Sequence, residues 1–237
     1  IGVLTARLGP QWRHSYDGTV RPATGQAPAI ADVVRPDGGQ IRFTQQGALW
    51  VSEEDIADRL VQLTDVWGQP RGWELRLAAE DRVETYDGVG KLLSIAQRGG
   101  LTQRLTYSTG SGTRYPATAP ACTPPAGASL PASGLLWCVT DAFGRQLHFS
   151  YDSSNRLTKL FDPAGGQTLY TYSAAGSFLT SVTTPDAAVR TYHYNEAAHT
   201  AGANLPYALT GITDENNSRF ATFGYNSEGR AVSSEHA

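Results

Sequence analysis

The side chains that could do chemistry are few, and their spacing restricts the reactions open to them. Four acidic residues, Glu53, Glu54, Asp55 and Asp58, could in principle supply paired carboxylates for hydrolysis. A glycosidase, however, needs two carboxylates at a defined separation across a cleft. Neighbouring residues on one turn do not give that geometry, so the pattern favours a solvated run of charge.

Other catalytic or metal-binding patterns are also missing from the sequence. The five histidines show no HxH or HExxH spacing, and no serine lies in a GxSxG context. His148 and His193 lie in alternating segments and are expected to face outward from strands. The sequence therefore predicts no enzyme, no cofactor and no metal centre. The histidines are His14, His148, His193, His199 and His236.

The two cysteines, Cys122 and Cys138, flank a stretch rich in Pro, Ala, Ser and Gly. Two cysteines without a CxxC motif do not make a zinc site. They are either two unrelated buried thiols or a disulfide that closes a surface loop. A disulfide of that loop size would contribute about 3 kcal/mol in the chain-entropy model and would indicate an oxidising destination.

A tyrosine followed by Asp, Asn or Ser recurs along the chain, and this repetition is the main feature of the sequence. Exposed aromatic side chains on a sheet could stack on sugars or peptides. Alternatively, each Tyr packs inward and each Asp or Asn caps a turn. Repetition favours the structural interpretation, because a catalytic motif needs to occur only once. The anchoring tyrosines are Tyr86, Tyr107, Tyr151, Tyr172, Tyr194 and Tyr225.

Each repeat of about 21 residues predicts one β-hairpin step. Alternating apolar and polar residues, such as Leu147, Phe149 and Tyr151, have the strand period of two. A short turn follows, as in "DSSN", "DGVG", "SAAG" and "NSEG", then a second strand, then a turn such as "DPAGG" or "DENN". A single hairpin cannot bury its face alone. The predicted fold is all-β: one antiparallel sheet of successive hairpins that forms a partial spiral or cocoon shell.

The segment 1–80 is less regular than the rest of the chain. It is predicted to be a β segment, with either a short helix near 52–63 or a loop followed by a strand there. The helical alternative depends on Ile56, Leu60 and Leu63 at helical spacing and on Ser52 as an N-cap. The repeat sheet is expected over 81–237. Insertions at about 110–136 and 196–208 account for the two longest tyrosine spacings.

Composition and charge exclude two further classes of protein. The 237 residues include 25 Gly, 13 Pro and 11 Tyr, which suits short strands and tight turns. A net charge of −3 argues against a nucleic-acid partner, which would require a basic patch. No run of 18 apolar residues is present, so no membrane span is predicted.

With its units aligned, the sequence resembles the RHS/YD-repeat family. The family unit is a strand ending in Tyr-Asp, a small turn ending in Gly, then Arg-Leu and a further strand. It is matched best by "YDGVGKLL" (86–93), "YDSSNRLTKL" (151–160) and "YNSEGRAV" (225–232), with weaker copies at Tyr172 and Tyr194. The segments "LGPQWRHSYD" and "GWELRLAAEDRVETYD" are similar to the region that precedes the repeats in bacterial RHS proteins. The resemblance therefore covers nearly the whole chain.

The resemblance implies a non-catalytic structural role. Full-length relatives are large proteins whose repeats coil into a hollow shell, which in polymorphic toxin systems encloses a C-terminal toxin until delivery, often through type VI secretion. The resemblance also implies export from a bacterial cell after a cytoplasmic stage. The structural repeat residues expected from it are Tyr86, Asp87, Gly90, Tyr107, Tyr151, Asp152, Arg156, Leu157, Tyr172, Tyr194, Tyr225, Asn226, Gly229 and Arg230.

The sequence departs from the family in its small number of repeats. Five to six repeats are too few for a closed cocoon, and no self-cleavage motif or toxin domain is present. The chain is therefore expected to be the N-terminal part of a shell. Its expected partners are the rest of the shell or its toxin domain, a secretion-system or immunity protein, and a second copy paired through an exposed sheet edge. The rival interpretation is an extracellular module that binds a carbohydrate or receptor. Trp12 and Tyr16 either dock across a shell opening or pack in a core.

Overall fold

The computed structural model describes residues 7–9, 12–23, 25, 28–174 and 178–236. Within these residues, nineteen β-strands and one short 3-10 helix form, and every strand pairing is antiparallel. The prediction of an all-β sheet of successive hairpins is thereby confirmed. Of the turns expected between repeat strands, the last part of "SAAG" (175–176) lies outside the described residues, as do residues 10–11 of "LGPQWRHSYD".

The chain divides into two compact units. One covers 13–148, and the other joins 149–237 with the N-terminal 1–12. The segment boundary near residue 80 stays a prediction. Within the 13–148 unit, Gly72–Leu77 pair with Arg82–Asp87 on either side of that position.

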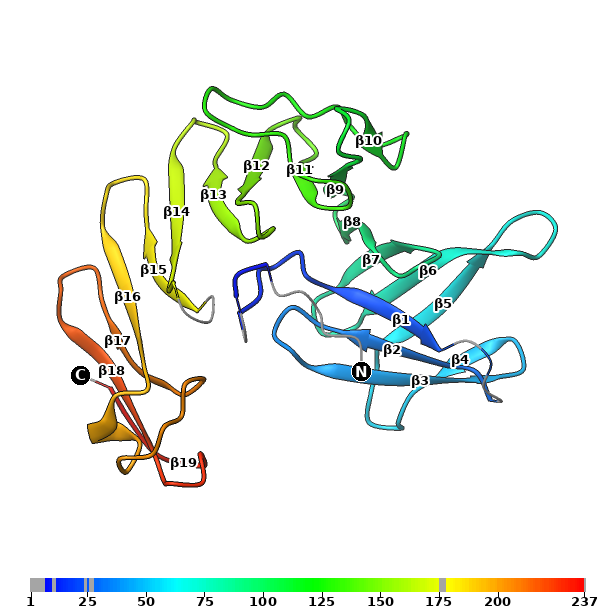
Figure 1. Ribbon diagram of the computed structural model, residues 1–237. Helices are drawn as coiled ribbons and strands as arrows, with labels where there is room; N and C mark the ends of the chain where they lie inside the picture. The colour runs from blue at the N-terminus through cyan, green and yellow to red at the C-terminus, as the bar shows by residue number, and fades with distance from the viewer. Residues whose placement is uncertain (1–6, 10–11, 24, 26–27, 175–177, 237) are drawn as a thin grey trace. The chain divides into compact units, whose positions relative to one another are not determined.

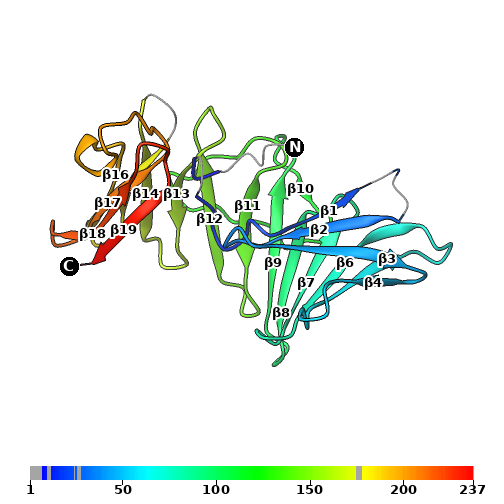
Figure 2. The ribbon, with the colours of Figure 1, turned by 90° about the horizontal axis from the view of Figure 1, so that it is seen from below.

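The 13–148 unit is a succession of hairpins in which each strand from β1 to β9 pairs with the next one in the chain. The strands β6 to β9 follow one another side by side in Figure 2. The short β10 pairs with β9, which also pairs with β11. The strands are β1 (Thr19–Ala23), β2 (Ile30–Val34), β3 (Gln40–Gln46), β4 (Leu49–Val51), β5 (Arg59–Thr64), β6 (Pro70–Leu77), β7 (Arg82–Asp87), β8 (Leu92–Gln97), β9 (Thr102–Ser108), β10 (Arg114–Tyr115) and β11 (Leu136–Thr140).

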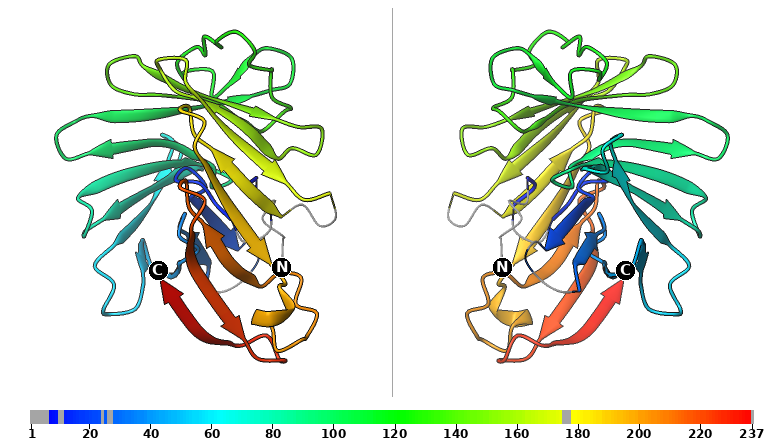
Figure 3. Two further views of the ribbon diagram at one scale, coloured as in Figure 1. Left: turned by 90° about the vertical axis from the view of Figure 1, so that its left-hand side faces the viewer. Right: turned by 90° about the vertical axis from the view of Figure 1, so that its right-hand side faces the viewer.

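The other unit continues the same pattern, and its hairpins lie in succession from yellow to red in Figure 3. Strand β12 (Gln146–Tyr151) contributes its first three residues to the 13–148 unit and the rest to this one. The remaining elements are β13 (Leu157–Phe161), β14 (Gln167–Tyr172), β15 (Leu179–Thr183), β16 (Val189–Tyr194), η1 (Ala197–His199), β17 (Leu209–Thr213), β18 (Arg219–Tyr225) and β19 (Ala231–His236).

Residues 52–63 do not form the helix that was one of the two expected alternatives. A turn closes where Ile56 N–H donates to Glu53 O, and β5 then begins at Arg59. Leu60 pairs with Trp50 on one side and with Leu75 on the other, which buries it. Pairing with strands on both sides outweighs the helical spacing of three apolar residues.

Seven of the described hairpins are closed by one type of turn, whether or not a tyrosine precedes it. In each, the first residue's N–H donates to the carbonyl four residues on, and its side-chain oxygen accepts two N–H groups of the turn. The fourth residue has positive φ and is Gly or Asn. This is a three-residue hairpin loop with a left-handed residue at its end. Such turns begin at Asp65, Asp87, Asp141, Asp152, Asp162, Asp214 and Asn226.

The first Tyr-Asp turn also anchors the start of the sheet. Val20 N–H and the Thr19 hydroxyl both donate to Gly90 O, at 3.0 and 2.8 Å. This brings β1 against the turn that joins β7 and β8, as Figure 1 shows. A methyl group on Gly90 would lie 1.6 Å from Val20 O, so only glycine allows this approach.

Replacing Gly90 by Ala is expected to separate β1 from this turn. Gly90 and Gly68 occupy the same turn position with φ of +85° and +79°, but a methyl on Gly68 meets nothing within 4 Å. Gly68→Ala should therefore cost only the backbone strain, about 1–2 kcal/mol, and Gly90→Ala clearly more. Urea unfolding of both variants measures the difference; equal losses of stability would contradict the anchoring role of Gly90.

Candidate functional site: the recurring tyrosine contact

The repeat tyrosines use their hydroxyl groups inside the sheet. In four repeats the hydroxyl donates to the backbone carbonyl of the first residue of the preceding strand, which is a leucine each time. That leucine lies 15 residues before the tyrosine in three repeats and 16 in the fourth. The contacts are Tyr107 to Leu92 O at 2.6 Å, Tyr172 to Leu157 O at 2.5 Å, Tyr194 to Leu179 O at 3.0 Å and Tyr225 to Leu209 O at 3.0 Å.

The accepting carbonyl belongs to a β-bulge. Tyr172 pairs with Leu179 but Thr171 pairs with Ser181, so Thr180 is an extra residue in β15. A bulge disrupts the local ladder and leaves backbone groups without strand partners. A carbonyl in a half-buried sheet must still find a donor. The tyrosine of the next strand supplies that donor.

The extra residue satisfies a second carbonyl at the same bulge. The hydroxyl of Thr180 donates to Thr171 O at 3.1 Å, on the strand that it faces. An equivalent contact joins Thr158 to Ser150 O at 3.2 Å. Thr210 also lies 3.2 Å from His193 O, but it shares its one proton with Glu196, which is closer at 2.7 Å. In these three repeats, a threonine and the following tyrosine therefore each donate near the same bulge. At Leu92 the extra residue is Leu93, so only the tyrosine donates there. The signal was present in the sequence as a Leu-Thr pair at 157–158, 179–180 and 209–210.

In two of these repeats, the residue before the leucine is a cation that lies over the ring of the same tyrosine. The Lys91 ammonium lies 4.5 Å from the centre of the Tyr107 ring. The Arg156 guanidinium lies 4.7 Å from that of Tyr172. These are cation–π contacts, each contributing on the order of 1 kcal/mol. The Arg-Leu of the repeat thus holds the next tyrosine by its ring and by its hydroxyl.

Asp152 shows how the aspartate of the repeat contributes. Its Oδ1 accepts the N–H groups of Ser154 and Arg156, both at 2.9 Å, and its Oδ2 accepts the Arg156 guanidinium at 2.7 Å. Burial acts to raise the pKa of Asp152, but these hydrogen bonds and the charge of Arg156 hold its pKa below the ordinary value. The aspartate therefore fixes both the turn and the arginine that covers the next ring.

Tyr86 makes a different contact from these four tyrosines. Its hydroxyl donates to Glu84, whose other carboxylate oxygen accepts Arg82 at 2.7 Å. Arg82 also pairs with Glu80, which pairs in turn with Arg35. Glu84 is only 2% exposed. Burial first, and then the charge of Glu84, raises the pKa of Tyr86 far above its usual value.

The N-terminal segment packs on the repeat tyrosines of its own unit. Arg7 O accepts Leu157 N–H at 2.7 Å and the Tyr172 hydroxyl at 3.3 Å. The Trp12 indole N–H donates to the Tyr194 hydroxyl at 2.8 Å, and its ring lies 4.7 Å from that of Tyr192. Of the two alternatives for Trp12, the described residues show packing within one unit.

The insertion at 196–208 is held by one ion pair. Glu196 accepts two hydrogen bonds from Arg219, at 3.1 and 2.7 Å, and one from the Thr210 hydroxyl at 2.7 Å. The bonds from Arg219, and then the one from Thr210, lower the pKa of Glu196 to about 2 although burial opposes them. Asn195 closes the same loop by accepting Leu205 N–H at 2.7 Å.

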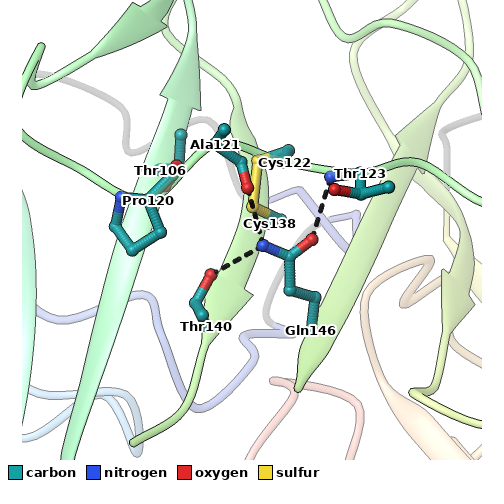
Figure 4. The surroundings of a disulfide bond; sticks show 8 residues. All are labelled: Thr106, Pro120, Ala121, Cys122, Thr123, Cys138, Thr140 and Gln146. Atoms are coloured by element: carbon teal, nitrogen blue, oxygen red, sulfur yellow. Dashed lines mark hydrogen bonds between the residues drawn. A yellow bond between two sulfur atoms is a disulfide. The ribbon is translucent and has the colours of Figure 1, made fainter. Parts of the chain in front are cut away.

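Cys122 and Cys138 form a disulfide, with their Cα atoms 5.8 Å apart. It fastens the long loop between β9 and β11 to the sheet. Figure 4 shows that the Gln146 side chain holds the same stretch of loop: its amide nitrogen donates to Ala121 O at 2.7 Å and its oxygen accepts Thr123 N–H at 2.9 Å. The loop is therefore clamped on both sides of Cys122.

The residues first considered for chemistry do not come together. Glu53, Glu54 and Asp55 are exposed, and Asp58 accepts the backbone N–H of Ala78 at 2.9 Å. His148 is buried rather than facing outward as expected, and burial lowers its pKa. In the part of the chain that the structure describes, no three His, Cys, Asp or Glu residues form a metal-binding group. None of the described helices is long and apolar enough to cross a membrane.

Comparison with known proteins gives only structural neighbours. No protein-family model matches the sequence, and no curated protein matches it. A chain in the crystal structure of TcdB2-TccC3-Cdc42 is similar over 88% of this chain, with 14% identity and a TM-score of 0.38. A chain of the Photorhabdus luminescens Tc holotoxin pore with a mutated TccC3 is similar over 89%, with 16% identity and a TM-score of 0.38. The matched region spans only 12% and 10% of those chains.

Removing one tyrosine hydroxyl should show how much its hydrogen bond to the bulge carbonyl contributes to the free energy of unfolding. Tyr172→Phe leaves Leu157 O without this donor and is expected to lower the free energy of unfolding by about 1–3 kcal/mol. Tyr207→Phe is the matched control in the same unit, because Tyr207 is 58% exposed and its ring contact, against Phe178, is one that phenylalanine keeps. Urea denaturation of the two variants tests this; equal stabilities would contradict it.

The lowered pKa of Glu196 predicts a loss of stability in acid. A carboxylate whose folded pKa lies below its unfolded pKa stabilises the fold above the unfolded value and loses that contribution as pH falls through the folded one. The contribution of Glu196 should therefore be complete above about pH 4.5 and decline toward pH 2. Glu196→Gln should lower stability at pH 6 and reduce the further loss at pH 3, measured by urea unfolding. Glu228→Gln, at an exposed ion pair, should leave both values near wild type.

Proposed function

We propose that this chain is a non-catalytic structural section of an RHS/YD-repeat shell. The observation that carries the proposal is the recurring tyrosine contact. The residues that define the repeat use their hydroxyl groups, carboxylates and cations on neighbouring strands of the same sheet. Side chains that make these contacts hold neighbouring strands together and are not available to bind a substrate.

The rival function, carbohydrate binding, requires several exposed aromatic rings in a row. The repeat tyrosines do not offer such a row. Tyr86 and Tyr107 are buried, and Tyr151, Tyr172, Tyr194 and Tyr225 are only partly accessible. The limited exposure of these six rings therefore supports the shell rather than a glycan-binding surface.

In the full-length protein, the shell would enclose a C-terminal toxin and help to deliver it out of a bacterial cell. Its partners would be the remainder of the shell, the toxin domain, and a secretion-system or immunity protein. The Cys122–Cys138 disulfide agrees with an oxidising destination after a cytoplasmic stage. Type VI secretion and competition between bacteria are the setting that the sequence resemblance implies.

The proposal is tested by reading the coding region beyond codon 237 and expressing the longer product. We expect further Tyr-Asp units with the same period as those in this chain, followed by a domain without repeats. In the longer product, that domain should resist protease until the sheet is unfolded. The same domain expressed alone is the control and should be cut rapidly. Equal cleavage rates, or a continuation without repeats, would contradict the proposal.

A further inference from the structure

Strand β19 has one paired side and one open side. It pairs with β18, and the registers of the described residues give it no second partner, since β2 pairs with β1 and β3. All six of its residues, Ala231–His236, are exposed. An open edge presents unpaired backbone N–H and C=O groups to any strand of matching length.

The start of β19 reproduces the receiving half of the tyrosine contact. Tyr225 pairs with Ala231 while Gly224 pairs with Ser233, so Val232 is the extra residue of a bulge. Ala231 therefore stands where Leu179 and Leu209 stand in the earlier repeats. In those repeats, the following strand provides a tyrosine for the carbonyl at this position.

Both groups that would hold that tyrosine are uncovered in β19. Arg230 corresponds to Arg156, but its side chain is 77% exposed whereas that of Arg156, which lies over Tyr172, is 26% exposed. No side chain among the described residues donates to Ala231 O. The ring-covering cation and the bulge carbonyl are thus present without the tyrosine that they hold elsewhere.

We propose that the outer edge of β19 binds an antiparallel strand of the Tyr-Asp type, with its tyrosine hydroxyl on Ala231 O and its ring beneath Arg230. The inference rests on the proposed function, because such a strand would belong to a neighbouring section of shell. A second copy of β19 is a poorer occupant, since the segment 231–236 contains no tyrosine. The partner strand is therefore defined by a tyrosine at the register that places its hydroxyl on Ala231 O.

The probe is a peptide with the chain's own sequence 165–173, GGQTLYTYS, which contains the β14 strand and Tyr172. It is titrated to millimolar concentration into the isotope-labelled protein. We expect amide chemical shifts to change at 230–236. Fluorescence anisotropy of the labelled peptide gives its affinity. The peptide with Tyr172→Phe should bind about five-fold more weakly, the usual effect of one hydrogen bond.

A pair of protein variants tests the second contact. Arg230→Ala should weaken binding of the native peptide by about three-fold through loss of the cation–π contact. Arg145→Ala is the matched control: Arg145 holds the same position in the Asp141 turn and is also exposed, at 64%. It should leave the affinity unchanged.

Three results would overturn the inference. One is an absence of shifts at 230–236 at millimolar peptide; another is equal affinity for the native and phenylalanine peptides. The third is self-association through β19 that the peptide does not displace, shown by light scattering. If the longer product still protects its C-terminal domain from protease, the proposed function stands even where strand binding at β19 fails. The two hypotheses can therefore fail separately, and the experiments tell the failures apart.

Discussion

The sheet depends on a hydrogen bond from a tyrosine hydroxyl to the carbonyl at a β-bulge. Each bulge lets a strand leave its turn with the correct face inward, but it also leaves a carbonyl that the ladder cannot satisfy. Tyr172, for example, satisfies Leu157 O from the next strand. The bond therefore does two things: it removes the cost of an unpaired polar group, and it fixes how successive hairpins are placed.

This contact explains where the chain tolerates insertions. The spacing from the accepting leucine to its tyrosine is 15 or 16 residues in all four contacts, because two strands and one turn separate them. Both long insertions fall outside that span: one follows Tyr107, and the other lies between Tyr194 and Leu209. A loop can lengthen there without changing the register. The ion pair of Glu196 with Arg219, and the disulfide of Cys122, then fasten the two loops to the sheet.

The sequence predicted the repeating features better than the unique ones. Alternation and turn residues repeat, so their pattern indicated an all-β sheet of hairpins. The segment 52–63 occurs once, and its apolar spacing suits a helix as well as a strand; pairing of Leu60 with β4 and β6 decides between them. The buried partner of Tyr86 was also beyond prediction. The sequence around Glu84 does not distinguish it from other polar residues, and only the fold makes it buried.

The contact also gives the array a direction. In the four contacts, the bulge carbonyl is satisfied by a tyrosine later in the chain, so each of these repeats depends on the strand that follows it. For the first repeat tyrosine, Tyr86, Pro70 at the start of β6 stands where the later repeats have the accepting leucine, and Glu84 accepts the hydroxyl instead. At the other end, the bulge at Ala231 has its cation and carbonyl but no tyrosine among the described residues. The array thus begins at the buried carboxylate of Glu84, which accepts the Tyr86 hydroxyl. The β19 edge, in contrast, keeps the cation and the bulge carbonyl of an interior repeat. Such an edge is suited to extension by a further strand.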